Sequence, residues 1–300
     1  MCALAALVLL SCEKTPVEVP ETDQAHSLPE SILWDLAGRY PEATVTSAGG
    51  GEEMEYVHIS LIDKDGLKNE VAYKNGEWMV SEKRLDVNGF LDNLPKPVVK
   101  TYLKTGIGHE TFLEGSYVIE ITRKGLSQKQ YEIDCMAPYL DGEKLIESQH
   151  WHIVIAEDGT LLTCGLHESY NATIGMVDLC PALTFIREKY GYVPVVGIID
   201  EGGDANIFIR DGDVLKTVTF RAYRSDFEVA DFEWRHTEYT LPLDTALPAH
   251  VQKAIDGYET EHPGEKWSGL SMLETVEGFS YGLTFGTELH YCRFYIGVQD

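Results

Sequence analysis

Two histidines that flank a tryptophan, His150 and His152, have the most suitable type and spacing for metal binding in this chain. Alternate side chains of a β-strand point to the same face, so both histidines would lie opposite Trp151. Neutral imidazole binds Zn²⁺, and His167 follows fifteen residues later as a further candidate. The alternative is that His150 and His152 are solvent-facing side chains of an ordinary strand. The sequence favours this alternative, so we predict no metal site and no cofactor.

A cysteine nucleophile is the second chemistry that the residue types allow. Cys164 and His167 lie three residues apart, and a neighbouring histidine can activate a thiol. Catalytic cysteine and histidine residues are usually distant in sequence, however, and no residue that would orient this histidine is recognisable. The chain also lacks G-x-S-x-G, H-E-x-x-H and a glycine-rich phosphate loop. We therefore predict no catalytic residue and no enzymatic activity.

Acidic residues gather at several predicted turns. The segment Asp63-Lys64-Asp65-Gly66 begins like a calcium loop but lacks the third ligand and the closing glutamate of an EF-hand. The segment Asp211-Gly212-Asp213 has the same character. Asp-Gly is also a typical hairpin dipeptide, because glycine accepts a positive φ. We predict turns at these segments, with weak cation binding as the alternative.

A short apolar run near the N-terminus ends at Cys12, a candidate site of lipid attachment. Residues 3–10 are all apolar and are followed by Ser11. Eight residues cannot cross a bilayer, which needs about 20, but they suit a secretory signal. The pattern resembles the bacterial lipobox, so we predict a signal peptide at residues 1–12 with lipidation of Cys12. No Lys or Arg precedes the run, which leaves the translation start open, and a short buried helix or strand is the alternative.

The segment after Cys12 has the composition of a linker. Residues 13–26 are rich in Pro, Glu and Thr and poor in apolar side chains. Such a segment cannot bury enough apolar surface to fold. We predict a disordered tether here.

Four cysteines follow the tether, and none of their spacings matches C-x-x-C or a zinc ribbon. Cys135 and Cys292 alternate with apolar residues in strand-like patterns, which predicts buried free thiols. Cys164 and Cys180 flank the middle of the chain. Whether these two form a disulfide remains open at the level of the sequence.

The charge balance excludes one class of partner. The chain has 49 acidic and 24 basic residues, and its formal net charge is −25. A field of this sign repels nucleic acid and anionic lipid surfaces. Cationic partners, divalent ions or simple solubility are compatible with it.

Four amphipathic helices, each followed by alternating strand patterns, are expected to organise the chain. Pairs of matching helix starts are 151 and 153 residues apart. We therefore predict an α+β protein made of about four tandem units, each with one helix packed on an antiparallel meander. The offset predicts two domains of two units each, at residues 27–168 and 176–300, joined near residues 171–177. A longer polar insertion is predicted at residues 137–148. The helices start near Leu28-Pro29, Leu94-Pro95, Leu179-Cys180-Pro181 and Leu247-Pro248.

Several motifs of the first unit resemble a known family. These are the Leu-Pro helix start, the helix exit Tyr40-Pro41-Glu42-Ala43, the strand Glu55-Tyr56-Val57 and the turn Asn75-Gly76-Glu77-Trp78. Together they resemble the PepSY-like, beta-lactamase-inhibitor-protein-like (BLIP-like) lipoproteins of Bacteroidetes. The resemblance implies a repeated helix-plus-four-strand unit and an envelope location. It supplies no catalytic motif, and inhibition of a beta-lactamase does not follow from the family name.

These patterns together favour recognition over catalysis. We predict a non-enzymatic, lipid-anchored protein of the cell envelope, attached to the outer membrane, that binds a protein or peptide through exposed sheet faces. The 16 tyrosines and 5 tryptophans are suited to such contacts. The alternative is an exported enzyme or a metal-dependent glycan-binding protein. The ligand, the oligomeric state and the choice between periplasmic and surface-facing orientation remain open.

Overall fold

The computed structural model describes residues 28–49, 55–86, 90–105, 116–141, 144–166, 180–201, 204–225, 228–286 and 291–298. The predicted signal peptide with Cys12, the tether at residues 13–26 and the predicted domain junction at residues 171–177 lie outside the described residues. The chain divides into two compact units. The first comprises Met1–Asn93 and Tyr117–Lys124, and the second Leu94–Ser116 and Gly125–Asp300.

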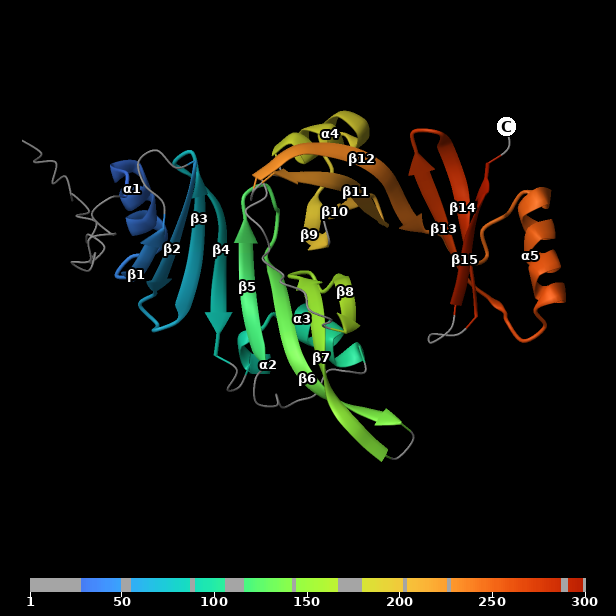
Figure 1. The fold of residues 1–300 in the computed structure, drawn as a ribbon, viewed down its shortest axis with the longest axis horizontal. Helices are drawn as coiled ribbons and strands as arrows, with labels where there is room; N and C mark the ends of the chain where they lie inside the picture. The colour runs from blue at the N-terminus through green and yellow to red at the C-terminus, as the bar shows by residue number, and fades with distance from the viewer. Residues whose placement is uncertain are drawn as a thin grey trace, which may run out of the picture. The chain divides into compact units, whose positions relative to one another are not determined.

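The first unit consists of helix α1 on an antiparallel sheet and of a short helix, α2, which lies in sequence before the last strand of this unit (Figure 1). Each strand of the sheet pairs with the next strand in the sequence. Its elements are α1 (Glu30–Arg39), β1 (Thr44–Gly49), β2 (Tyr56–Ile62), β3 (Lys68–Lys74), β4 (Glu77–Leu85), α2 (Phe90–Asn93) and β5 (Tyr117–Arg123).

In its described residues, the second unit contains three helices and two runs of sequentially paired strands. The first run is β6–β8 and the second is β9–β15. The α+β class with antiparallel sheets is therefore confirmed. The elements are α3 (Lys96–Lys104), β6 (Gln130–Asp141), β7 (Lys144–Ala156), β8 (Leu161–Leu166), α4 (Cys180–Tyr190), β9 (Val195–Glu201), β10 (Asp204–Asp211), β11 (Val214–Ser225), β12 (Glu228–Thr240), α5 (Ala249–Glu261), β13 (Trp267–Thr275), β14 (Gly278–Gly286) and β15 (Tyr291–Gly297).

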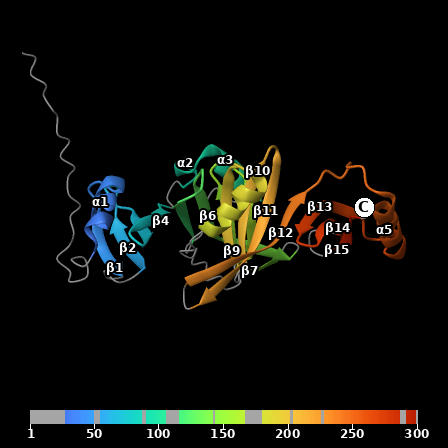
Figure 2. The same cartoon turned by 90° about the horizontal axis from the view of Figure 1, so that it is seen from above.

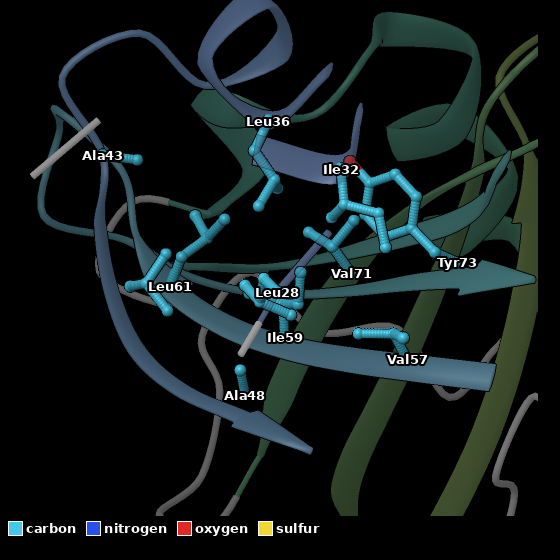
Figure 3. Close-up of a cluster of buried hydrophobic side chains, with 11 residues drawn as sticks. Leu28, Ile32, Leu36, Ala43, Ala48, Val57, Ile59, Leu61, Val71 and Tyr73 are labelled. Atoms are coloured by element: carbon cyan, nitrogen blue, oxygen red, sulfur yellow. The ribbon is translucent and has the colours of Figure 1, made fainter. Parts of the chain in front are cut away.

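The core of the first unit follows from two sequence periods. Ile32 and Leu36, one helical turn apart, are almost fully buried, and Figure 3 shows both pointing from α1 toward the sheet. Strand β2 alternates, with Val57, Ile59 and Leu61 buried against the helix. Pro29 precedes the first helical residue, where its fixed φ is compatible with a helix start. The apolar stripe of α1 and one face of the sheet therefore form a single core.

In the second unit, β6–β8 are covered on both faces. Helix α3 packs on β7. The opposite face meets β9 and β10, because Val154, Ala156 and Leu162 form one buried cluster with Val196, Ile199 and Phe208. The side chain of Gln130 also donates to the carbonyl of Ile198 over 3.0 Å. This second layer explains why polar positions of β6 are buried.

Helices α4 and α5 each cover one face of their own strands. Phe185 of α4 contacts Phe220 edge-on, with ring centroids 5.4 Å apart. Val251 and Ile255 of α5 pack with Leu270, Leu283 and Phe285 of β13 and β14. Figures 1 and 2 show α5 on one side of β13–β15 and no described helix on the other. None of the helices in the described ranges is long and apolar enough to cross a membrane.

Candidate functional site

A groove opens on the helix-covered face of the first sheet, beside α1. A helix is about 10 Å wide and strands lie about 4.8 Å apart, so one helix covers only two or three strands. Helix α1 packs over β1–β3 and also contacts β4, and the groove opens over β4 and β5 at its edge. The cavity there has a volume of about 280 Å³. We call it the α1 groove, and its lining residues are Arg39, Tyr40, Asn69, Trp78, Ser81, Lys83, Glu120 and Thr122.

One wall of the α1 groove is a guanidinium on an indole. The Arg39 guanidinium carbon lies 4.1 Å from the centroid of the Trp78 ring, a cation–π distance. Arg39 Nε also pairs with Asp35 Oδ2 at 2.6 Å, and the Tyr73 hydroxyl donates to the same oxygen at 2.8 Å. Burial raises the pKa of Tyr73, and the hydrogen bond to the Asp35 carboxylate adds to it. These contacts hold the Arg39 guanidinium over the Trp78 ring.

The floor of the groove is made of hydroxyl groups. Trp78 Nε1 donates to Ser81 Oγ at 2.8 Å, and Thr122 lies opposite Ser81 in the register of β4 and β5. The Tyr40 hydroxyl also lies near Ser81, and burial raises the pKa of Tyr40 above its ordinary value. A phenol is already protonated at physiological pH, and the raised pKa keeps it so, which leaves the Tyr40 hydroxyl able to donate a hydrogen bond.

The far wall carries charges that continue into the β2–β3 turn. Lys83 pairs with Asp63 Oδ2 at 2.8 Å, and the Asn69 amide donates to the same oxygen at 3.3 Å. Asp63 Oδ1 accepts from the backbone N–H of Asp65 and of Leu67. Burial alone would raise the pKa of Asp63, but Lys83 and these donors lower it. The Asp63 carboxylate thus accepts hydrogen bonds within the turn, in agreement with the interpretation of this segment as a hairpin turn.

The α1 groove has the chemistry of a recognition site. Its lining offers an indole, a phenol, hydroxyls, an amide, two cations and Glu120, which lies opposite Lys83 in the register. Its lining contains neither cysteine nor histidine, so it holds no activated nucleophile of the Cys–His type. From this set the sequence motifs include Tyr40 and Trp78, both as parts of the family resemblance and neither as a site residue. Because α1, β3, β4 and β5 contribute one to three residues each, no local motif marks the groove.

His150 and His152 lie on one face of β7, as the alternation predicted, but each is placed against an acid of β6. His150 Nε2 contacts Asp134 Oδ1, and His152 Nδ1 lies 3.7 Å from Glu132 Oε1. Asp134 is completely buried, and the His152 side chain is only 14% exposed. The solvent-facing interpretation is therefore wrong for His152, because β9 and β10 cover this side of the sheet. Within the described part of the chain, no three His, Cys, Asp or Glu residues are grouped to hold a metal.

The cysteines described by the structure are all free thiols. Burial raises the pKa of the Cys164 thiol, which makes it a poor nucleophile at neutral pH. Its proposed partner His167 lies outside the described residues. Cys135 is buried as predicted, and its burial raises the pKa to about 11. Cys292 is exposed, contrary to the prediction, because it lies near the end of the edge strand β15.

Comparisons with known proteins give only structural neighbours of low sequence identity. No protein-family description matches the chain, and no curated protein matches it. Solved structures similar to it include a BLIP-like protein from Bacteroides fragilis, with 17% identity and a TM-score of 0.36 over 51% of this chain and 96% of that chain. A DUF2874 family protein from Bacteroides uniformis has 12% identity and a TM-score of 0.34 over 48% and 94% of the two chains.

A third similar structure comes from Bacteroides eggerthii and is provisionally named periplasmic. It has 15% identity and a TM-score of 0.33 over 48% of this chain and 92% of that chain. A BLIP-like protein of Bacteroides, the kind of protein that the motifs of the first unit resemble, is thus among the solved structures similar to this chain.

Proposed function

We propose that this chain is a non-enzymatic binding protein of the cell envelope that holds a protein or peptide partner in the α1 groove. The observation that carries the proposal is the groove itself, an open strand surface with aromatic, cationic and acidic groups in about 280 Å³. Pockets for whole small molecules usually start at about 300 Å³. The α1 groove is therefore better matched to one or two side chains of a larger partner.

The charges around the groove favour a basic side chain. Arg39 is paired with Asp35, and Lys83 with Asp63. Glu120 lies in the same lining, on a chain with a net charge of −25. A partner with an exposed Lys or Arg beside an apolar group would meet Trp78, the Glu120 carboxylate and the negative field of the chain. Such rim charges should also make association sensitive to salt.

Filling the groove should abolish partner binding without unfolding the protein. Thr122→Arg places a long side chain into the cavity from the partly exposed strand β5. Glu277→Arg, in the exposed turn between β13 and β14, also introduces an arginine but away from the groove, with a charge change that is larger than that of Thr122→Arg. A partner captured by the wild type from envelope extract should bind the Thr122→Arg protein at least about tenfold more weakly. The Glu277→Arg protein should bind it like the wild type, and circular dichroism should show both variants folded.

Two outcomes would contradict the proposed function. One is partner capture that Thr122→Arg leaves intact, which would place the binding surface elsewhere. The other is a hydrolytic activity of the purified protein that is lost on substitution of His150, His152 or Cys164. A lower melting temperature in the presence of EDTA would likewise favour a metal-dependent alternative.

The location and the domain organisation are further parts of this proposal. The apolar run before Ser11-Cys12 supports lipid attachment at Cys12, and Cys12→Ala should move the protein from the membrane fraction to the soluble fraction. Several acyl groups are needed for firm anchoring, because one acyl chain binds a membrane only weakly.

The offset of the helix starts supports tandem units in two domains, 27–168 and 176–300. If the two domains are joined near residues 171–177, limited proteolysis should cut the chain there first.

A further inference from the structure

A second cavity lies in the second unit, between helix α3 and the turn that joins β7 to β8. It has a volume of about 440 Å³. Lys96, Lys100 and Lys104 line it, four residues apart, and therefore lie in one row along the helix. The Cα atoms of successive lysines in this row are about 6 Å apart along the helix axis. The other lining residues are Pro97, Thr101, Asp158 and Gly159.

The three lysines form a positive island on an acidic chain. All three are exposed, and none forms an ion pair with another described residue. Other cations of the same unit are paired, for example Lys189 with Glu274 and Lys216 with Asp211. The overall charge of −25 would favour such pairing for these lysines as well. Their ammonium groups are instead available to a ligand.

Asp158, the acid in the lining of this cavity, interacts with Arg210 and not with the lysines. Asp158 Oδ2 accepts from Arg210 Nη2 at 3.2 Å, and its Oδ1 accepts from the Thr160 N–H at 2.9 Å. Burial would raise the pKa of Asp158, but hydrogen bonds from Thr160 and the charge of Arg210 lower it. Its negative charge is thus balanced by Arg210, and the cavity keeps the positive charge of the lysine row.

The turn is fixed to the helix, so the cavity is preformed. Thr101 Oγ1 donates to the carbonyl of Gly159 at 2.6 Å. Gly159 packs so closely on Pro97 that a Cβ there would lie 2.9 Å from the Pro97 carbonyl oxygen. A preformed site loses less entropy on binding than one that must be ordered.

We propose that the lysine row of α3 binds a compact phosphate-type anion, either free or as a phosphomonoester headgroup. Lysine is a point charge with three donors and suits tetrahedral oxyanions, whereas planar carboxylates favour the fork of arginine. The lining has no aromatic ring on which a nucleobase could stack. Pro97 is its only apolar residue, so it offers little to the side chains of a peptide. The site is separate from the α1 groove and does not depend on the function proposed for that groove.

Calorimetry with inorganic pyrophosphate tests the site in the full chain. The triple variant Lys96→Gln, Lys100→Gln, Lys104→Gln should bind pyrophosphate at least about tenfold more weakly than the wild type. The control Lys64→Gln, Lys253→Gln, Lys266→Gln removes the same charge from exposed positions elsewhere and should bind like the wild type. Because the lysines are exposed, both triple variants should keep the wild-type melting temperature, and Lys100→Glu alone provides a second, single-site variant.

Vesicles distinguish the two sources of the anion. The full chain with Cys12→Ala, which cannot reach a membrane through its predicted anchor, is mixed with phosphatidylcholine vesicles containing phosphatidic acid. Co-sedimentation that depends on the three lysines supports a headgroup ligand, and pyrophosphate binding without it supports a free phosphate. The proposal is overturned if neither probe binds, if the control loses as much affinity as the α3 variant, or if an oligoglutamate peptide binds more tightly than pyrophosphate.

Discussion

Replacing Gly159 with alanine should lower the free energy of unfolding of the second unit by about 3 kcal/mol. Gly159 has φ +89°, and a Cβ there would lie 2.9 Å from both the Cβ and the carbonyl oxygen of Pro97. A positive φ costs an alanine about 1–2 kcal/mol, and forcing a methyl group into packed surroundings adds about 1–3 kcal/mol. The turn between β7 and β8 would have to move away from α3. Urea unfolding followed by circular dichroism measures the change.

Gly212 is the matched control for this substitution. It also follows an aspartate in a hairpin turn and has φ +62°, but a Cβ there would meet nothing within 4 Å. Gly212→Ala should therefore cost only the backbone term, about 1 kcal/mol. Equal losses at Gly159 and Gly212 would mean that the contact between the turn and α3 contributes nothing. The Gly159 variant should also bind pyrophosphate less well, because the turn forms one wall of the lysine cavity.

Phe220→Ala should destabilise the second unit even more, by about 3–5 kcal/mol, which is the range for a buried aromatic truncated to alanine. Phe220 is 1% exposed and lies in the cluster under α4. Its ring meets Phe185 and Phe232 edge-on, at centroid distances of 5.4 and 5.9 Å. Removal would leave a cavity between helix and sheet and would also cancel both ring contacts.

Phe279→Ala, on β14 of the same unit, is the comparison. That ring is 48% exposed, so its loss should change the free energy of unfolding by about 0.5 kcal/mol. The denaturant slope should be the same for both variants, so that the midpoints compare directly. A Phe220 variant as stable as the Phe279 variant would show that the aromatic cluster under α4 can rearrange to fill the space.

The elements that could be predicted from the sequence are those with a clear period. The stripe Val251 and Ile255 marks α5, and the alternation Val57, Ile59 and Leu61 marks β2, and all five are buried. Strand β13 has no such period, because it mixes Ser, Gly and Glu with its few apolar residues. The polar insertion predicted at residues 137–148 is wrong. Strand β6 continues to Asp141 and strand β7 begins at Lys144, so the two strands form one long hairpin.

The sites were less predictable because they depend on contacts between distant segments. Glu132 and Asp134 alternate with Tyr131, Ile133 and Cys135, a pattern typical of a strand with one solvent-facing side. Only the packing of β9 and β10 on that side makes both acids buried. The α1 groove likewise depends on the register of β3, β4 and β5. The spacing of the α3 lysines was visible in the sequence, but not the turn that encloses them.

The strictly sequential order of the strands has a consequence for how the chain folds. Almost every strand finds its partner immediately before or after it, as in the β2–β3 hairpin with its five-residue connection 63–67. Closing short loops costs little chain entropy, and proteins dominated by local contacts reach their native state faster than those with distant pairings. Each hairpin can therefore form as soon as its own residues emerge from the ribosome or an export channel. Only the pairings across α2–α3 and across α5 must wait for a longer stretch of chain.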